Sequence, residues 1–383
     1  MKVAIVTNIL TPYRAYFYKE LEHQLRIDSG ELKVFALTDS LPLRGWNYGE
    51  LKQSFTELIP GKKFYLRGEE YLINLSINKV LKKFNPDIII VAGSWTYPTS
   101  WMIVRHKLKD VQYFFWTESH NNRATKVGTS NLIILKLKQN FYKKFDGFCI
   151  PGKYANETID DLIGKQGWRV FLPNLVDDKY YSKAIQLRSH KNELRNTYKL
   201  PQDKYIFICP ARLIEIKGIR VFLQNVVDCP NIKKATFVII GEGPDQKKIS
   251  DLSVKYHLDV RMLGYCKQDM VRDLYALADV FLLPSLQDPN PLAAIEAAFT
   301  GLPLLVSKYI GNAPELVKNK INGIIFDTVS KESVSEAMNF ILNVDSAWLV
   351  KAGNSSHEIA MEGFQCEIET SKLIQQLKRY ITK

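Results

Sequence analysis

The sequence predicts an α/β protein made of two doubly wound, parallel-sheet domains, and three observations lead to this prediction. The chain has 383 residues, more than one hydrophobic core usually serves, because single cores stop growing at about 250–300 residues. Short apolar runs alternate with amphipathic helical patterns through the first half of the chain. The same alternation starts again after a polar, strand-poor stretch at residues 177–203. Strands that are apolar throughout and separated by helices form parallel sheets that are covered on both faces.

The strands of the first half are expected at six places in chain order: VAIVTN, LKVFALT, DIIIVAG, VQYFFWT, DGFCIPG and WRVFLPN. They are rich in β-branched and aromatic residues. Helical spacing of apolar residues occurs between them in YRAYFYKELEHQL, SWMIVRHKL and NETIDDLI. We therefore expect an N-terminal domain over residues 1–176.

The second half predicts six further strands: YIFICPA, ATFVIIGEG, VRMLGY, VFLLPS, PLLVS and NGIIF. A helical pattern follows each of them, and beyond residue 326 the chain indicates helix only. We expect the C-terminal domain at 177–355 and a helical tail at 356–383 that packs back on the N-terminal domain.

Composition excludes several classes of protein. No segment approaches the roughly 18 consecutive apolar residues of a membrane-spanning helix, and the opening MKVAIVTNILTPYR indicates a first strand and not a signal peptide. The five cysteines lack metal-ligand spacing, as expected of reduced thiols in a cytoplasmic protein. No Asp-x-Asp pair occurs, so no metal site is predicted.

The net charge of +12 is concentrated in the first half, in residues 61–83 and 131–144. The run LIILKLKQNFYKKF mixes lysine with leucine, isoleucine and aromatic residues in a way that a helix can segregate. This pattern fits a peripheral contact with an anionic membrane, and a solvated basic face fits it equally well. Nucleic acid is not expected as a partner, because no nucleic-acid motif accompanies the charge.

The polar chemistry of the second half follows the ends of predicted strands. Arg212 and Lys217 come directly after YIFICPA, where two cations can hold an anion such as a diphosphate. Gly241 and Gly243 follow ATFVII and let the main chain bend under a flat ligand. Ligands of doubly wound sheets bind beyond the carboxyl ends of the strands, so this edge is the predicted site.

The densest stretch begins at VFLLPS and continues through a loop that contains Asp288. A helix is predicted after Pro291, and the free amides near Leu292 and Ala293 can donate to phosphate oxygens. Glu296 lies about one turn into this helix, where its carboxylate can accept hydrogen bonds from vicinal hydroxyls.

These residues carry a resemblance. PARLIEIKG, GEGP, LGY, the segment from LLPS to EA, and GNAPELVKNKINGIIF together resemble glycosyltransferase family 4, and the N-terminal half is collinear but weaker. TPYRAYFYKEL near the N-terminus resembles relatives that assemble surface polysaccharides, such as capsule or lipopolysaccharide. The resemblance implies the GT-B fold, two Rossmann-like domains that close over the donor in a cleft.

The resemblance also implies a retaining, metal-independent transfer of a hexose from a nucleotide-sugar, most simply a UDP-sugar, to a glycan or lipid-linked glycan acceptor. It assigns the diphosphate to Arg212 and Lys217, the ribose to Glu296, and hydroxyls of the donor sugar to Asp288. The remaining donor-binding positions that it implies are Gly241, Gly243, Tyr265, Asn290, Leu292 and Ala293. The N-terminal domain would bind the acceptor at the inner face of the cell membrane.

Two departures from the family pattern stand out. The usual glutamate and glycine-aromatic-glycine loop is replaced by Asp288, Pro289, Asn290 and Pro291, which shortens the acid and removes amide donors. The second glycine of a usual pair is Asn312, which a positive φ would explain.

In the first half, FFWTESHNN places Glu118 and His120 just past a predicted strand. His120 could polarise a hydroxyl or the leaving phosphate, and Glu118 could orient or deprotonate the acceptor hydroxyl. Each could equally be a surface-loop residue. Trp95, Tyr97 and Trp101 could stack on a sugar or fill the core.

Three alternatives remain open or are disfavoured. A transferase-like scaffold that binds sugar or nucleotide without turnover fits the Asp288–Pro291 departure. Such a scaffold does not need the diphosphate-binding residues Arg212 and Lys217, which argues against it. A nucleotide-sugar epimerase on the same fold is disfavoured by the motif pattern. A retaining hydrolase needs two carboxylates about 5 Å apart, whereas Asp288 and Glu296 are separated by about 10 Å or more along the chain.

Overall fold

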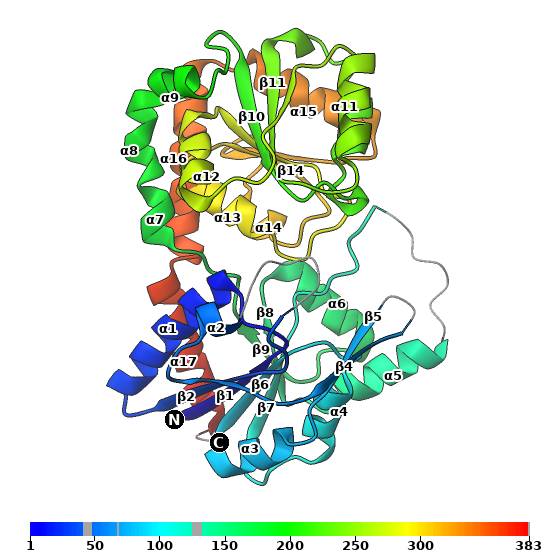
Figure 1. Cartoon of the computed structure of the whole chain (residues 1–383), viewed down its shortest axis with the longest axis vertical. Coiled ribbons are helices and arrows are strands. Elements are labelled where there is room, and N and C mark those ends of the chain that lie inside the picture. Colours follow the sequence, from blue (N-terminus) through cyan, green and yellow to red (C-terminus); the bar gives the residue numbers. More distant parts are fainter. Residues whose placement is uncertain (41–47, 67–68, 125–131, 382–383) are drawn as a thin grey trace. The chain divides into compact units, whose positions relative to one another are not determined.

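The computed structural model describes residues 1–40, 48–66, 69–124 and 132–381. Residues 67, 68 and 131, which belong to the two basic stretches named above, lie outside the described residues. The chain divides into two compact units: unit 1 comprises residues 1–119, 127–175 and 366–383, and unit 2 comprises residues 120–126 and 176–365. Each unit has its own parallel sheet, coloured from blue to green in unit 1 and from green to orange in unit 2 (Figure 1).

The sheet of unit 1 has seven parallel strands in the order β3-β2-β1-β6-β7-β8-β9. Their bounds are β1 (Lys2–Thr7), β2 (Glu31–Ala36), β3 (Thr56–Leu58), β6 (Ile88–Ala92), β7 (Gln112–Trp116), β8 (Gly147–Ile150) and β9 (Trp168–Phe171). Successive residues of β1 enter different cores, because Val3 and Ile5 pack on one face of the sheet while Ala4 and Val6 pack on the other. Burial on both faces explains why the central strands β1 and β6 are almost entirely apolar.

The helices of unit 1 are α1 (Pro12–Ile27), α2 (Tyr48–Leu51), α3 (Ile77–Phe84), α4 (Pro98–Arg105), α5 (Leu132–Tyr142), α6 (Lys153–Ile163) and α17 (Cys366–Ile381). The last of these comes from the end of the chain and packs against α1. Tyr380 of α17 stacks on Trp168 with ring centroids 4.1 Å apart, and Lys378 forms an ion pair with Asp28 at 2.8 Å. Apolar contacts, stacking and charge therefore all attach α17 to this unit.

The sheet of unit 2 has six parallel strands in the order β12-β11-β10-β13-β14-β15. Their bounds are β10 (Tyr205–Pro210), β11 (Ala235–Ile240), β12 (Val260–Met262), β13 (Val280–Leu283), β14 (Leu304–Ser307) and β15 (Gly323–Phe326). The strand order reverses between β10 and β13, which is the point where doubly wound sheets bind ligands.

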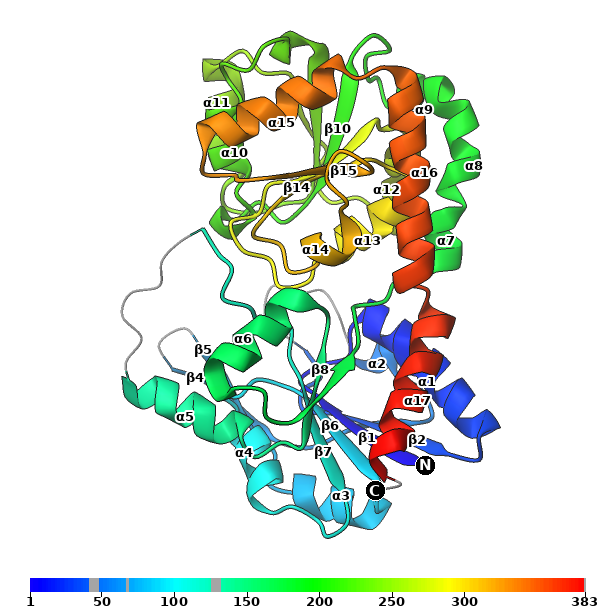
Figure 2. The ribbon, with the colours of Figure 1, turned by 180° about the vertical axis from the view of Figure 1, so that it is seen from behind.

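The helices of unit 2 are α7 (Asp178–Ser182), α8 (Ala184–Leu187), α9 (Lys191–Thr197), α10 (Ile219–Asn225), α11 (Gln246–Lys255), α12 (Gln268–Leu277), α13 (Leu292–Phe299), α14 (Ala313–Leu316), α15 (Lys331–Asn343) and α16 (Ser346–Gly363). α16 packs against α13, and it runs beside α7 and α8 in both views of the ribbon (Figure 2). Apolar cores lie on both faces of this sheet as well.

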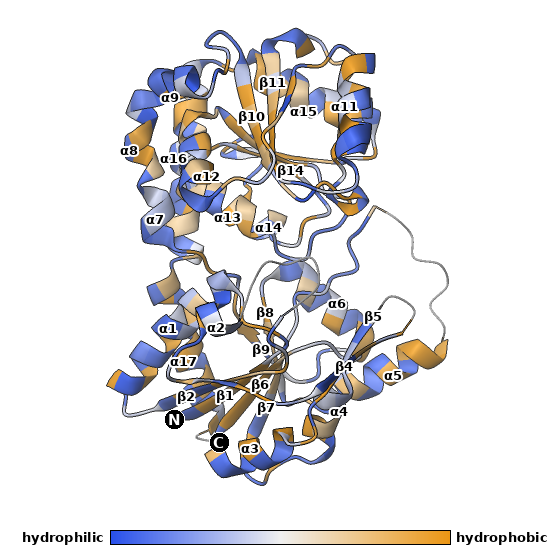
Figure 3. Ribbon diagram, in the orientation of Figure 1, coloured by the Kyte–Doolittle hydropathy of each residue, from blue (hydrophilic) through white to orange (hydrophobic). Residues whose placement is uncertain are grey.

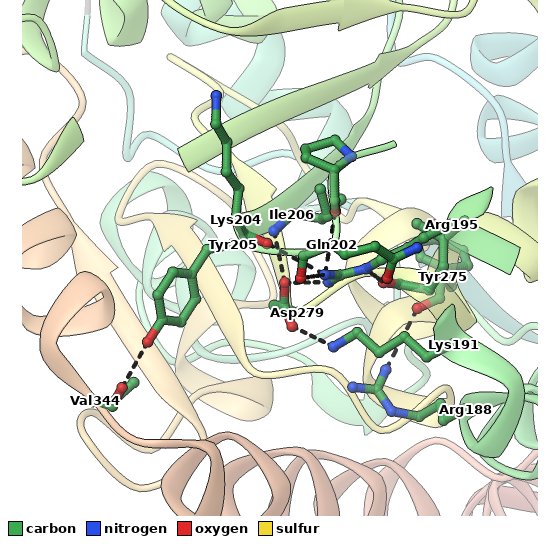
Figure 4. Close-up of polar contacts among 12 residues, drawn as sticks. Arg188, Lys191, Arg195, Gln202, Lys204, Tyr205, Ile206, Tyr275, Asp279 and Val344 are labelled. Carbon is green, nitrogen blue, oxygen red and sulfur yellow. Dashed lines mark hydrogen bonds and ion pairs between the residues drawn. The ribbon is translucent and has the colours of Figure 1, made fainter. Parts of the chain in front are cut away.

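The N-terminal edge of the unit 2 sheet is held by the carboxylate of Asp279, just before β13 (Figure 4). This carboxylate accepts hydrogen bonds from the Ile206 amide at 2.7 Å and from Arg195 Nη2 at 2.6 Å, and it forms an ion pair with Lys191. Arg195 also donates to the carbonyl oxygens of Leu277 and Lys204. The network fastens α9 to the start of two neighbouring strands.

The predicted fold class is confirmed: both halves are parallel, doubly wound α/β sheets, and all twelve expected strands are present. The sequence did not predict β3 or the antiparallel hairpin of β4 (Lys62–Leu66) and β5 (Glu69–Ile73). β4 is mostly exposed, so it lacks the apolar signal by which a buried strand is found.

Candidate functional site

The loops at the C-terminal edge of the unit 2 sheet are joined by backbone hydrogen bonds. The Leu213 amide donates to the Glu242 carbonyl at 2.9 Å, which links the loops after β10 and β11. The Gly311 amide donates to the Asp288 carbonyl at 2.8 Å, which links the loops after β13 and β14. Of the twelve candidate site residues predicted from the sequence, eleven belong to unit 2, and Glu118 belongs to unit 1. Ten of the eleven, all except His120, lie on the loops at this edge or on the helices that follow: Arg212, Lys217, Gly241, Gly243, Tyr265, Asp288, Asn290, Leu292, Ala293 and Glu296.

The glycine turn after β11 lies against the loop after β10. Gly241 has φ +129°, and a Cβ atom there would lie 2.3 Å from the carbonyl oxygen of Ala211. At Gly243 a Cβ atom would lie 2.4 Å from the carbonyl oxygen of Leu213. Only glycine permits this close approach of two backbones. The glycines thereby let the loops after β10 and β11 pack directly against each other.

Of the two cations in PARLIEIK, one is exposed and one is paired. Arg212 is exposed on the loop after β10. Lys217 forms an ion pair with the carboxylate of Asp288, and the two side chains are only 17% and 11% exposed. Two residues for which the sequence predicted separate contacts with a donor are therefore in contact with each other.

The segment before α13 is compact and mostly buried. Pro291 is the N-cap residue with φ −66°, and α13 begins at Leu292. Asn290 is buried, whereas Leu292 and Ala293 are half-buried at the start of the helix, where backbone amides lack helical partners. Asn312 has φ −99°, so the explanation by a positive φ is wrong. Its side-chain amide donates instead to the Pro291 carbonyl at 3.1 Å, which ties α14 to the start of α13.

Glu296 is held by tyrosines. Its Oε2 accepts a hydrogen bond from the Tyr275 hydroxyl at 3.0 Å. Burial raises the pKa of Glu296, while hydrogen bonds from Tyr181 and Tyr275 act in the opposite direction. Tyr265, by contrast, is exposed beyond β12, and its amide donates to Glu242 Oε1 at 3.3 Å. Sequence reasoning missed Tyr181 and Tyr275, because nothing near them along the chain marks a contact with α13.

His120 contacts the loop after β13. It is buried, and its Nε2 lies 3.1 Å from the carbonyl oxygen of Asp288. A carbonyl oxygen only accepts, so Nε2 carries the proton and donates. Burial lowers the pKa of His120, and the hydrogen bond to the Asp288 backbone opposes that shift. The sequence analysis expected His120 in the N-terminal domain. In the structure His120 belongs to unit 2, where its hydrogen bond to Asp288 also lies.

Glu118 lies in unit 1, in a pocket of about 450 Å³ beyond the carboxyl ends of β1, β6 and β7. Its Oε1 forms an ion pair with Arg14 Nη2 at 3.1 Å, and the Arg14 guanidinium lies 4.5 Å from the ring of Trp116. Trp95 and Tyr97 line the same pocket. The sequence did not single out Arg14, although its position three residues after the N-cap Thr11 places it at the start of α1.

The described residues contain no cluster of three histidine, cysteine or acidic side chains that could hold a metal ion. Among the described helices, none combines the length and apolar character that crossing a membrane requires.

The family model described as "Glycosyl transferases group 1" matches residues 190–353, which lie in unit 2. The chain is 30% identical over 174 residues to the UDP-Gal:alpha-D-GlcNAc-diphosphoundecaprenol alpha-1,3-galactosyltransferase of Escherichia coli, a match that covers 44% of this chain and 43% of that protein. The chain spans about half the length, or less, of the curated relatives it matches first.

Solved structures resemble the whole chain. Sucrose-phosphate synthase from Thermosynechococcus elongatus superposes with a TM-score of 0.75 at 16% identity, covering 100% of this chain and 99% of that one. Anabaena HepE in complex with UDP and glucose gives a TM-score of 0.71 at 15% identity, covering 99% and 100%. At these identities the likeness shows the fold, and that fold is GT-B.

Proposed function

We propose that the chain, whose residues 190–353 match the family model of glycosyl transferases group 1, transfers a hexose from a nucleoside-diphosphate-sugar to an acceptor hydroxyl with retention of anomeric configuration. The observation that carries the proposal is the gathering of Arg212, Lys217, Glu296 and the start of α13 at the C-terminal edge of one sheet.

Each of these groups suits one part of the donor. Loss of a nucleoside diphosphate builds negative charge on phosphate oxygens, and preorganised cations and helix amides stabilise such charge where it develops. Arg212, Lys217 and the amides of Leu292 and Ala293 supply both kinds of group without a metal ion. The carboxylate of Glu296, fixed by its tyrosines, accepts hydrogen bonds from the ribose hydroxyls.

The Lys217–Asp288 ion pair has a place in this scheme. Asp288 holds the ammonium group close to the N-terminus of α13 and neutralises it in the absence of donor. When a diphosphate binds, the ammonium group gains a second anionic partner, while the carboxylate turns to hydroxyls of the donor sugar. Gly241, Gly243, Tyr265 and Asn290 line the remaining wall of the donor site in this proposal.

UDP is the proposed nucleotide, supported by the UDP-Gal in the name of the E. coli relative and by the UDP in the HepE structure. The name of the same relative, which acts on a diphosphoundecaprenol-linked sugar, supports a glycan or lipid-linked glycan acceptor and a role in surface polysaccharide assembly. In unit 1 we place the acceptor in the pocket with Glu118, whose carboxylate orients or deprotonates the attacking hydroxyl.

The same proposal places the protein in the cytoplasm at the inner face of the cell membrane, in contact with anionic lipid. Leu132 and Ile133 of α5 are exposed, and Lys136 is exposed on the same helix. Figure 3 shows the apolar residues gathered at one end of α5. Apolar side chains beside lysines are the combination by which interfacial helices bind anionic lipid.

A thermal-shift titration with UDP, GDP, ADP and their sugar conjugates tests the donor assignment. A ligand that binds only the folded state stabilises it by mass action and so raises the melting temperature. At a ligand concentration of 100 times Kd, the stabilisation is about 2.7 kcal/mol. UDP and a UDP-sugar should raise the melting temperature, and a flat response to every nucleotide would overturn the proposal. Slow hydrolysis of the bound UDP-sugar without acceptor distinguishes an enzyme from a binding scaffold, and NMR of the product tests retention.

A further inference from the structure

Unit 1 contains a second pocket, of about 660 Å³, next to the one with Glu118. The two pockets share Trp95 as a lining residue, and the segment from β6 to α4 forms the border between them. The Trp101 indole donates a hydrogen bond to the Trp95 carbonyl at 2.9 Å, which fixes this border. A ligand that fills one pocket is therefore adjacent to the other.

The walls of the second pocket are mainly apolar. α4 contributes Trp101 and Met102, and α5 contributes Ile134 and Leu137. Ile134 is 51% exposed and Leu137 48% exposed, a large amount of apolar surface to leave in water on neighbouring turns of one helix. The volume lies in the range of small-molecule sites. A concave apolar site of this kind fits a hydrocarbon chain.

Basic side chains also line this pocket or lie beside it. Arg105 and His106 line it and are exposed, and the Arg105 guanidinium lies 5.4 Å from the ring of Trp101. Lys136 is exposed on α5, one residue before Leu137. Exposed positive groups beside an apolar pocket complement a hydrocarbon chain that carries a phosphate.

We propose that this second pocket binds the hydrocarbon chain of the acceptor, so that the acceptor is a phosphate-linked glycolipid whose sugar lies in the Glu118 pocket and whose chain passes Trp95. The inference rests on the proposed function for the identity of its ligand as an acceptor. The proposed occupant is one hydrocarbon chain bound between α4 and α5. The bilayer surface and a second copy of the protein are not the proposed occupants.

Binding of farnesyl phosphate, followed by tryptophan fluorescence, tests the pocket directly. We expect saturable binding by the wild-type protein, because Trp95 and Trp101 line the site. Leu137→Asp should weaken it about tenfold or more, since a carboxylate then meets the chain and repels the phosphate. Val254→Asp is the matched control, because Val254 is an exposed apolar residue of α11 (72%) far along the chain from the pocket. It should bind as the wild type does.

Further ligands separate the competing occupants. Inorganic phosphate at the same concentration should neither bind nor compete, because it has no chain. Equal affinity of Leu137→Asp and the wild-type protein for farnesyl phosphate would overturn the inference. Binding to phosphatidylcholine vesicles without binding to farnesyl phosphate would do the same, as would concentration-dependent self-association that Leu137→Asp abolishes.

A UDP thermal shift on the same samples separates the two proposals. A variant that keeps the UDP shift is folded, so its loss of farnesyl phosphate binding comes from the pocket. If UDP binds and farnesyl phosphate does not, only the lipid site is wrong. If farnesyl phosphate binds and no nucleotide does, the lipid site stands and the proposed transferase function fails.

Discussion

The two edges of the unit 2 sheet use charge in opposite ways. At the N-terminal edge, the carboxylate of Asp279 is surrounded by Arg195, Lys191 and a backbone amide, all of them donors (Figure 4). At the C-terminal edge, Arg212 is exposed, and among the described residues Lys217 has one carboxylate partner, Asp288. Charges that are fully paired stabilise a fold, whereas exposed or singly paired charges can still take a ligand. The comparison predicts that stability and the proposed donor binding are separable within one sheet.

The largest effect that we predict is on the free energy of unfolding, and it follows substitution of Asp279. Asp279→Ala removes the partner of the buried Arg195 guanidinium, and breaking a buried ion pair costs about 3–5 kcal/mol. Urea unfolding should show this loss, while the UDP affinity of the remaining folded protein stays unchanged. The control is Asp251→Ala, whose exposed pair with Lys247 contributes about 0–1 kcal/mol. A loss below about 1 kcal/mol for Asp279→Ala would show that the N-terminal edge is not held by this network.

Arg212→Ala should have the converse effect at the other edge. Removal of a preorganised donor to developing charge lowers kcat by about 10²–10³-fold, equal to about 2.7–4 kcal/mol. Because Arg212 is exposed, the free energy of unfolding should stay within about 0.5 kcal/mol of the wild-type value. Steady-state kinetics with a UDP-sugar measures the first quantity and urea unfolding the second.

Arg261→Ala, at another exposed arginine of unit 2, serves as the control for Arg212→Ala and should keep wild-type kinetics. Unchanged kcat in Arg212→Ala would remove Arg212 from the diphosphate site.

Glu296→Gln is expected to have a smaller effect. The amide keeps the shape of the side chain and its contact with Tyr275, but loses the charge that strengthens hydrogen bonds to ribose hydroxyls. UDP should bind about tenfold more weakly, the scale of one charge-assisted hydrogen bond. Isothermal titration calorimetry measures this, with Glu358→Gln on the exposed side of α16 as control. Equal UDP affinity in the two variants would show that Glu296 does not hold the ribose.

The sequence predicted the sheet architecture well because its strands are buried on both faces. Val3 to Val6 are all apolar for that reason, and β6, β8 and β13 give the same uninterrupted signal. The hairpin of β4 and β5 was missed because exposed strands lack it. Along the chain, the position of a residue after a predicted strand was enough to place Arg212, Lys217 and Asp288 at the C-terminal edge of the sheet, whereas their roles stay predictions.

What the sequence could not predict were contacts between distant side chains. The Lys217–Asp288 ion pair joins positions 71 residues apart, and Tyr275 reaches Glu296 from the preceding helix. His120 was expected beside Glu118 because the two are neighbours in sequence, yet its hydrogen-bond partner is the Asp288 carbonyl in unit 2. Such pairings depend on the fold, and a single sequence without its relatives gives no local sign of them.

The smallest expected effect is the pH dependence that His120 adds to stability. Burial lowers its pKa below the ordinary value of 6.5, so the folded state holds the neutral imidazole while the unfolded chain takes up a proton first. The contribution of His120 is therefore complete above pH 6.5 and is lost as the pH falls toward its folded pKa. Urea unfolding at pH 7.5 and pH 5.5 should show that the wild-type protein loses more stability on acidification than His120→Asn does. Between pH 7.5 and 8.5, where the imidazole is neutral in both states, the two proteins should change in parallel. An equal loss for both proteins between pH 7.5 and 5.5 would mean that His120 is hydrated at the C-terminal edge and is not buried against the Asp288 loop, which would remove it from the framework that holds the donor site.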